Sequence, residues 1–211
     1  MQYKILIADD HAVVRAGVIK ATITAFPDAI IREASNTAEI SRCLHESEWD
    51  LIVLDVSMPG RSGLDILNEI VTRYPATKVI IFSMYPEDQF AIRAIKAGAA
   101  AYVTKDTNLS ELTGIMEKIL RGQRHISPTI AELLINQIND HAPKPGHELL
   151  SDREYEVFRL IASGKAPAEI ANELCLSVKT ISVYRTNILR KMNLKNNAEI
   201  MYYAFKNSLV E

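Results

Sequence analysis

Three carboxylates, one hydroxyl and one amine occupy comparable places in the first half of the sequence, each at or just after the end of a short apolar run. They are Asp9 and Asp10 after YKILIA, Asp55 after LIVL, Ser83 at the end of KVIIFS, and Lys105 two residues after AYV. Carboxylates that share a partly buried crevice repel each other and need a cation to coexist. Mg²⁺ is the natural cation, because it prefers oxygen ligands and pairs with few carboxylates plus phosphate.

These groups together predict phosphoryl transfer to a carboxylate. A carboxylate can act as a nucleophile and form an acyl phosphate, and a divalent cation offsets charge on the transferred group. A lysine adds a point charge on a phosphate oxygen. Each residue alone is more often a turn residue, a helix cap or a solvated charge, so the interpretation depends on their convergence.

The elements between these residues predict that convergence. Short β-branched runs, typical of buried strands, are found at 3–8, 29–33, 51–54, 78–82 and 101–103. Stretches with helical periodicity lie between them, at 13–25, 37–47, 63–73, 88–97 and 109–121. Five such repeats predict a parallel sheet with helices on both faces. Ligands of such a sheet bind where the strands end at their carboxyl edges.

The second half of the chain has a different pattern. Residues 127–139 predict one helix, with Ser127 as its N-cap and Pro128 at its first position. The prolines and glycine of HAPKPGHE then predict a linker. Ser151 and Glu154 fit a capping box. They open a region that predicts four helices, at about 151–162, 167–174, 178–192 and 196–206.

A local basic segment lies in this helical region. SVKTISVYRTNILRKMNLK, residues 177–195, has five basic residues and no acidic one, whereas the whole chain has a net charge of −2. Apolar residues before and inside it predict two short helices packed together, at Ile170, Ala171, Leu174, Leu176, Val178 and Ile181. This is the helix-turn-helix pattern, whose second helix enters the major groove of DNA. A solvated helix face is the alternative explanation of the charges.

Residues 1–121 resemble the receiver domain of two-component response regulators, through ILIADDH, LIVLDVSMPGRSGLDIL, VIIFSM and GAAAYVTKD. The resemblance implies a flavodoxin-like (βα)5 doubly wound sheet, a sensor histidine kinase as partner, and Asp55 as the phosphorylated residue. It implies that Asp10, Asp55 and the backbone carbonyl of Ser57 bind Mg²⁺ or another divalent cation, with Asp9 acting mainly through water.

The same resemblance assigns the phosphate-binding and switch residues. Ser83 and Lys105 would bind the phosphoryl group, and Ser83 and Tyr102 would form the switch pair, in which the hydroxyl is drawn toward phosphate and the ring changes its packing. Many receivers have proline after the lysine, whereas this chain has Asp106. The lysine itself is unaffected by that departure.

Residues 151–211 resemble the LuxR-type output domain of the NarL/FixJ group of response regulators, through LSDREYEVFRLIASGKAPAEIANELCLSVKTISVYRTNILRKMNL. The resemblance implies a helix-turn-helix from about Pro167 to Thr186, a third helix that recognises DNA and a fourth that contributes to dimerisation. The residues expected at the DNA are Lys179, Thr180, Ser182, Val183, Arg185, Thr186 and Arg190. Of these, Lys179, Arg185 and Arg190 are expected at phosphates and Ser182, Val183 and Thr186 at bases.

Two positions depart from the usual LuxR-type pattern. Ser182 stands where the family often has lysine, which should reduce non-specific attraction to phosphate, and Tyr184 stands where it often has histidine. Tyr184 is expected either in the core or at the DNA.

The predicted organisation is a receiver at 1–121, a partly helical linker at 122–146 and a DNA-binding domain at 147–211. We expect a transcription regulator that becomes a homodimer on paired half-sites of double-stranded DNA when phosphorylated. It is expected not to be an enzyme, with at most slow autodephosphorylation. One rival is a Mg²⁺-dependent phosphatase of the aspartyl-phosphate type, which typically has a second Asp where Ser57 stands. The other is an adaptor whose helical domain binds protein.

Composition fits a chain of two ordinary globular domains, with 211 residues and 48% hydrophobic residues. Cys43 and Cys175 are too far apart for a metal or disulfide framework and are expected to be small buried hydrophobes. The sequence predicts no signal peptide, and no apolar run approaches the ~18 residues that span a membrane. We therefore expect a cytoplasmic protein without membrane contact.

Overall fold

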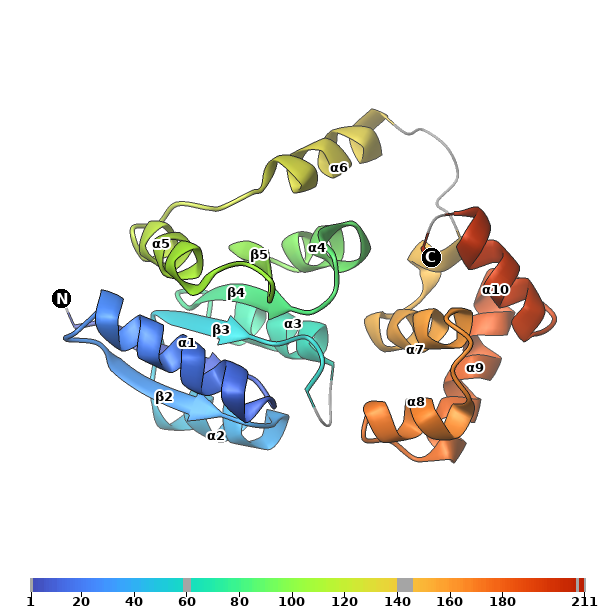
Figure 1. Cartoon of the computed structure of the whole chain (residues 1–211), viewed down its shortest axis with the longest axis horizontal. Helices are drawn as coiled ribbons and strands as arrows, with labels where there is room; N and C mark the ends of the chain where they lie inside the picture. Colours follow the sequence, from blue (N-terminus) through green and yellow to red (C-terminus); the bar gives the residue numbers. More distant parts are fainter. Residues whose placement is uncertain (1, 59–61, 140–145, 208, 211) are drawn as a thin grey trace. The chain divides into compact units, whose positions relative to one another are not determined.

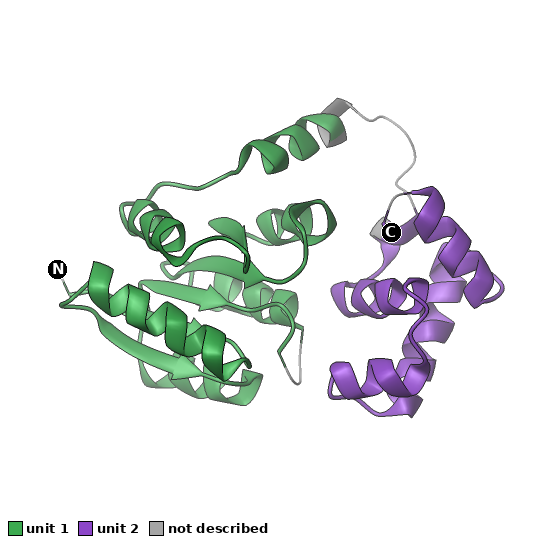
Figure 2. Ribbon diagram, in the orientation of Figure 1, with its two compact units in different colours: residues 1–140 green, residues 141–211 purple. Residues whose placement is uncertain are grey.

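The computed structural model describes residues 2–58, 62–139, 146–207 and 209–210. The chain divides into two compact units, Met1–Asp140 and His141–Glu211 (Figure 2). Each unit has its own buried core, so each is described separately.

The first unit is built on a five-stranded parallel sheet with the strand order β2-β1-β3-β4-β5 (Figure 1). Its strands are β1 (Lys4–Ala8), β2 (Ile30–Ala34), β3 (Leu51–Leu54), β4 (Lys78–Ser83) and β5 (Ala101–Thr104). The five predicted strands are confirmed, with ends that differ by one residue at most. In the register, Ala8 pairs with Leu54 and Ser83 pairs with Thr104, so the carboxyl ends of these strands lie along one edge.

Helices cover both faces of this sheet, as predicted (Figure 1). They are α1 (Ala12–Ala25), α2 (Thr37–Glu46), α3 (Gly63–Arg73), α4 (Glu87–Lys96) and α5 (Leu109–Leu120). One core cluster joins alternate residues of the inner strands, such as Ile7, Val53 and Phe82, to Val18 of α1 and Met116 of α5. Alternation places their neighbours on the opposite face, so every residue of β3 is buried.

Local capping explains where several of these helices begin. Asn36 accepts a hydrogen bond from the backbone N–H of Glu39, and Asn108 accepts one from that of Glu111. An N-cap side chain of this kind satisfies a helix N–H that has no partner within the helix. These two caps mark where α2 and α5 begin.

A further helix, α6 (Pro128–Asn139), belongs to the first unit rather than to an extended linker. Ser127 is its N-cap, because its Oγ accepts a hydrogen bond from the N–H of Ile130. The helix packs against α4, and Ile130 is completely buried. The helix predicted at 127–139 is therefore confirmed, and residues 140–145 of the predicted linker lie outside the described residues.

The second unit is helical throughout its described part. It contains a short 3₁₀ helix η1 (Gly146–Leu149) followed by α7 (Asp152–Ala162), α8 (Pro167–Glu173), α9 (Val178–Met192) and α10 (Asn197–Lys206). The capping box predicted for Ser151 and Glu154 is present. Helix α7 packs against both α9 and α10, and α8 packs against α9. The four predicted helices are confirmed.

Two burial predictions in the second unit are wrong. Cys175 is exposed, because it occupies a left-handed position (φ 51°) in the turn between α8 and α9 rather than the inner face of a helix. Val178 is 48% exposed, because it is the first residue of α9 and precedes the turn that packs inward. Cys43 is buried, as predicted.

Among the described residues, no helix combines the length and the apolar character that crossing a bilayer requires.

Candidate functional site

The structure brings three of the predicted site residues into direct contact at the carboxyl edge of the sheet. Asp9 follows β1, Asp55 follows β3 and Lys105 follows β5. The Nζ atom of Lys105 lies 2.7 Å from Oδ2 of Asp9 and 2.7 Å from Oδ2 of Asp55. All three side chains are almost completely buried, since no more than 4% of each is exposed. The convergence predicted from the strand ends is thus confirmed for these groups.

Burial and charge act in opposite directions on the two partners of this contact. Burial raises the pKa of Asp55, although the adjacent Lys105 ammonium works against that rise. Burial alone would lower the pKa of Lys105, but the carboxylates of Asp55 and Asp9 outweigh it and raise that pKa. The site therefore retains a cation beside Asp55, whose own negative charge is costly to maintain.

Asp10 lies beside this pair and completes an acidic cluster. Its side chain is 27% exposed, whereas Asp9 and Asp55 are buried. Oδ2 of Asp9 and Oδ1 of Asp10 are buried, and they lie 2.7 Å from Nζ of Lys105 and 2.8 Å from Nδ1 of His11, respectively. Buried carboxylate oxygens with unused acceptor capacity fit a hard divalent cation such as Mg²⁺.

His11 is a member of the cluster that sequence reasoning missed. Its Nδ1 lies 2.8 Å from Oδ1 of Asp10 and 3.3 Å from Oδ1 of Asp9. Its backbone N–H donates a hydrogen bond to Asp9 at 2.8 Å, and it is the N-cap residue of α1. Its position directly after two acidic residues at a strand end was the available signal.

Two described residues that follow β3, Ser57 and Gly63, lie close to Asp55. The N–H of Ser57 donates to Oδ1 of Asp55 at 3.1 Å. Gly63 approaches so closely that an added Cβ would lie 2.5 Å from the carbonyl oxygen of Asp55. Only glycine fits there without displacing backbone. Gly63 is thus a positioning residue that sequence reasoning assigned only to a helix start.

The two predicted switch residues meet at a third residue, Tyr85. Ser83 is completely buried at the end of β4, and its Oγ accepts a hydrogen bond from the N–H of Tyr85 at 3.1 Å. The hydroxyl of Tyr102 donates to the carbonyl oxygen of Tyr85 at 2.7 Å. The ring of Tyr85 stacks on Phe90 of α4, with ring centroids 4.6 Å apart. The turn between β4 and α4 is therefore tied to both residues.

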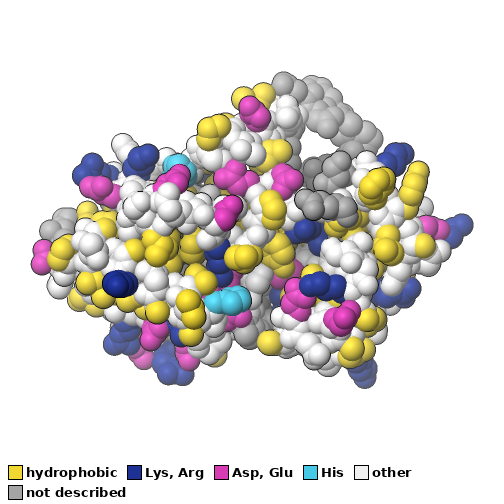
Figure 3. Space-filling view, in the orientation of Figure 1, with side chains coloured by type: hydrophobic (Ala, Val, Ile, Leu, Met, Phe, Trp, Pro, Cys, Tyr) yellow, Lys and Arg dark blue, Asp and Glu magenta, His cyan; other side chains and the backbone are white. Residues whose placement is uncertain are grey.

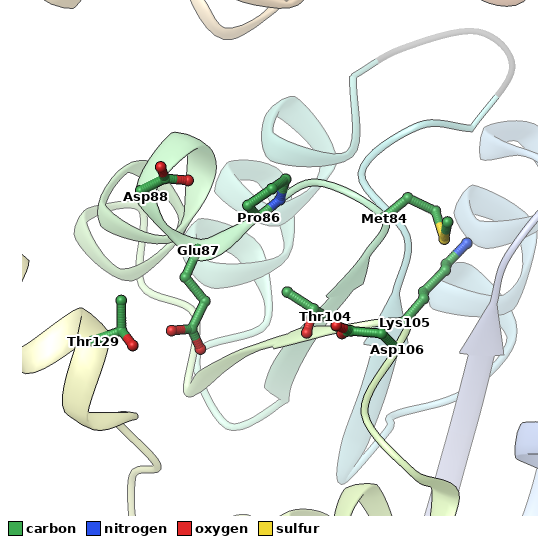
Figure 4. Close-up of a pocket in the computed structure, with 8 residues that line it drawn as sticks. All are labelled: Met84, Pro86, Glu87, Asp88, Thr104, Lys105, Asp106 and Thr129. Carbon is green, nitrogen blue, oxygen red and sulfur yellow. The ribbon is translucent and has the colours of Figure 1, made fainter. Parts of the chain in front are cut away.

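A groove of about 480 Å³ lies next to this turn (Figure 4). Its lining comes from the turn after β4, the start of α4, the end of β5 with the two residues after it, and α6: Met84, Pro86, Glu87, Asp88, Thr104, Lys105, Asp106 and Thr129. Figure 4 shows Thr129 of α6 on the side of the groove where Glu87 lies, and the amine of Lys105 close to Met84. The groove thus extends from the acidic site toward α6.

In the second unit, most of the predicted DNA-contacting residues form one exposed stripe along α9. Lys179, Ser182, Val183, Thr186 and Arg190 are exposed and repeat at a helical spacing of three to four residues. The opposite face packs inward through Ile181 and Ile188, which are buried. Lys and Arg side chains are visible on the surface of this unit (Figure 3).

Three other residues of α9 that were considered for contact with DNA are less exposed to solvent. Arg185 is half-buried and donates from Nε to Oδ1 of Asn197 in α10 at 2.6 Å. Thr180 is half-buried, and its hydroxyl bonds to that of the N-cap residue Ser177. Tyr184 is half-buried as well. The arginine therefore supports the packing of α10 on α9 in addition to any contact with DNA.

Each of the two units matches a known protein family. Residues 5–117 match the family described as "Response regulator receiver domain", and residues 148–204 match "Bacterial regulatory proteins, luxR family". The first match alone covers more than half of the chain and includes every residue of the acidic cluster.

Several known proteins are similar to the chain over nearly its whole length. The chain is 34% identical to the Oxygen regulatory protein NreC of Staphylococcus carnosus, over 99% of both chains. It is 31% identical to the Response regulator GacA of Pseudomonas syringae, over 99% of this chain and 98% of that protein. A structure of RcsB from Salmonella enterica, bound to promoter rprA in the presence of the phosphomimetic BeF₃⁻, has a TM-score of 0.61. It is 24% identical and covers 96% of this chain and 98% of its own, which shows a shared fold. The chain belongs to the two-component response regulators, with a receiver domain followed by a DNA-binding domain of the LuxR family.

Proposed function

We propose that Asp55 is the phosphoacceptor of the receiver and that a sensor histidine kinase is the phosphoryl donor. The observation that carries this proposal is the position of Lys105 Nζ, 2.7 Å from the carboxylates of both Asp9 and Asp55. One oxygen of Asp55 would attack phosphorus, so that an O–P bond forms while the N–P bond of the phosphohistidine breaks. The imidazole leaves with the electron pair of that bond and takes up a proton.

Asp10, Asp55 and the backbone carbonyl of Ser57 are proposed to bind Mg²⁺ or another divalent cation, with Asp9 acting through water. The unused acceptor capacity of Asp9 and Asp10 supports this assignment. A bound divalent cation would offset the negative charge that the phosphoryl group brings to the three carboxylates.

Lys105 and Ser83 are proposed to bind the phosphoryl group once it is attached. The ammonium of Lys105 already contacts the Asp55 oxygen and would transfer that contact to a phosphate oxygen. The hydroxyl of Ser83 would turn toward the same group and donate a hydrogen bond to it. Tyr102 shares Tyr85 with Ser83 and would change its packing as that turn moves.

The phosphoryl group is proposed to persist rather than to turn over. Ser57 occupies the position where aspartyl-phosphate enzymes carry a second aspartate, and its N–H is the group that reaches Asp55. Without a general acid or base at that position, hydrolysis is not accelerated strongly. This favours a phosphoacceptor with at most slow autodephosphorylation over a Mg²⁺-dependent phosphatase.

The second unit is proposed to bind double-stranded promoter DNA through α9, as a homodimer on paired half-sites after phosphorylation. The exposed stripe of α9 supports Lys179 and Arg190 as phosphate contacts and Ser182, Val183 and Thr186 as contacts to bases. Thr180 and Arg185 are proposed at the edge of this interface, because each also bonds within the domain. We propose a receiver at 1–121, a linker at 122–146 whose helix α6 packs against α4 of the first unit, and a DNA-binding domain at 147–211.

Phosphorylation of the purified full chain tests the acceptor directly. Acetyl phosphate and Mg²⁺ should add one phosphoryl group, which peptide mapping should place on Asp55, and Asp55→Ala should gain none. A single phosphoryl group on another residue would reject Asp55 as the acceptor. Continuous release of phosphate at steady state would favour the phosphatase instead.

A further inference from the structure

Helix α6 is attached to the receiver at the end of α4 that faces the phosphorylation site. Ser127 donates from Oγ to Oε2 of Glu87, the first residue of α4, at 2.7 Å. The same Oγ accepts from the N–H of Ile130 at 3.1 Å. Ser127 is thus both the N-cap of α6 and its hydrogen-bonded link to α4. Three residues further on, Ile130 is completely buried and adds an apolar anchor.

The same turn connects this link to the proposed switch. Only three residues separate Ser83 from Glu87. Within them, the N–H of Tyr85 is held by Ser83, and its carbonyl is held by the hydroxyl of Tyr102. A change in either contact therefore moves the backbone that carries Glu87.

The surroundings leave space for such a movement. The groove beside the turn is lined by Met84 and Pro86 on one side and by Thr129 of α6 on another (Figure 4). Met84 is 72% exposed, so its own side chain does not oppose a shift of the turn. By contrast, Phe90, one turn further along α4, is buried, and its stacking with Tyr85 limits how far the turn and the start of the helix can move.

We propose that α6 is a phosphorylation-sensitive arm: phosphorylation of Asp55 weakens the contact between Ser127 and Glu87 and loosens α6 from α4. This inference rests on the proposed function of Asp55. When the Ser83 hydroxyl turns toward the phosphoryl group, its contact with the N–H of Tyr85 lengthens and the turn shifts Glu87 away from Ser127. Helix α6 ends at Asn139, immediately before the residues that lead to the second unit, so its release changes where that unit is tethered.

Amide hydrogen exchange of the full chain measures this release. A helix of 12 residues is marginal in water without packing, so loosened α6 should exchange quickly. Mg²⁺ with beryllofluoride should speed the exchange of α6 amides by about tenfold, the effect of losing one hydrogen bond to a charged group. The Asp55→Ala chain should show no change with the same additions.

Two pairs of variants test the two anchors without added ligand. Ile130→Asp places a charge at the buried position and should give fast exchange in α6, whereas Ile135→Asp changes a residue of the same helix that is 57% exposed and should not. Glu87→Ala removes the acceptor of Ser127 and should speed exchange in α6. Asp88→Ala, which removes an exposed acid from the same first turn of α4, should leave it unchanged.

The outcomes separate this inference from the proposed function. If beryllofluoride alters exchange at 83–87 but leaves α6 as protected as before, the arm is rejected while Asp55 retains its role. Equal exchange in the Glu87→Ala and Asp88→Ala chains would also reject it. If neither 83–87 nor α6 responds to beryllofluoride, the proposed function of Asp55 and the arm fail together.

Discussion

Lys105 bridges Asp9 and Asp55, with its Nζ 2.7 Å from a carboxylate oxygen of each, although Lys105 and Asp55 are 50 residues apart in the sequence. The lysine contacts two carboxylates of the proposed cation site, in which Asp55 is a ligand and Asp9 acts through water. Its positive charge therefore stabilises the pair and at the same time opposes binding of a second cation. We therefore expect Lys105 to affect both the binding of the cation and the binding of the phosphoryl group.

Replacing Lys105 by methionine should strengthen Mg²⁺ binding and weaken phosphorylation. Removal of the ammonium leaves two buried carboxylates without their cation, so Mg²⁺ should bind several-fold more tightly. The phosphoryl group should attach more slowly, because its oxygens lose a charged partner. Calorimetric titration with Mg²⁺ measures the first effect, and the time course with acetyl phosphate measures the second. Lys20→Met on α1 serves as the control for charge. Unchanged Mg²⁺ affinity in Lys105→Met would contradict the bridging role.

Gly63→Ala should destabilise the receiver and disturb its site. The new Cβ would lie 2.5 Å from the carbonyl oxygen of Asp55, and relief of that overlap should cost about 1–3 kcal/mol of unfolding free energy. Gly114→Ala is the matched control, because no atom lies within 4 Å of its added Cβ and it is within α5. That variant should be about 0.5–1 kcal/mol more stable than wild type. Denaturant unfolding measures both changes. A Gly63→Ala chain as stable as wild type would show that position 63 can accept a side chain.

Acid should destabilise the second unit partly through Glu154. Burial tends to raise the pKa of this carboxyl, but its hydrogen bonds with Lys191 and Ser151 outweigh burial and lower it. The folded-state pKa is thus below the unfolded value, so the contribution is complete above the unfolded pKa and is lost as pH falls through the folded pKa. Glu154→Gln should therefore make stability less dependent on pH in the acidic range. Thermal unfolding between neutral and acidic pH measures this dependence.

Glu173→Gln is the control for that experiment. Glu173 pairs with Lys165, and both side chains are substantially exposed, at 43% and 39%. Exposed pairs contribute little to stability because water and salt screen them. The pH dependence of this variant should match wild type. If it flattened as much as that of Glu154→Gln, the pair of Glu154 and Lys191 would have no special role.

Lys179→Ala and Arg190→Ala should weaken DNA binding at phosphates rather than at bases. Each should lower the slope of log affinity against log salt by about one and reduce affinity for different sequences alike. Arg185→Ala should differ, because this residue also bonds to Asn197 and its loss should lower the stability of the second unit. Lys206→Ala changes an exposed charge of α10 and should leave the slope unchanged. Fluorescence anisotropy at several salt concentrations measures each slope. A Lys179→Ala slope equal to wild type would place that residue away from the phosphates.

The contact of Asp9, Asp55 and Lys105 was predictable because parallel strands end at one edge, and strand ends can be located from apolar runs. The starts of helices were predictable because a capping residue such as Asn36 bonds to a backbone N–H within one turn of the chain. The role of Tyr85 and the docking of α6 on α4 were not predictable, because they depend on which side chains meet after folding. Cys175 was assigned to the core because its neighbours in the sequence are apolar, whereas the chain turns there and leaves it exposed.

Genome-wide mapping of bound DNA, in cells carrying the wild-type chain or Asp55→Ala, tests most directly whether Asp55 controls DNA binding. The account predicts that occupied promoters lose most of their occupancy in the Asp55→Ala strain when both proteins are present at equal levels. Equal occupancy by the two proteins would contradict the account, because it would show that α9 binds DNA independently of phosphorylation at Asp55.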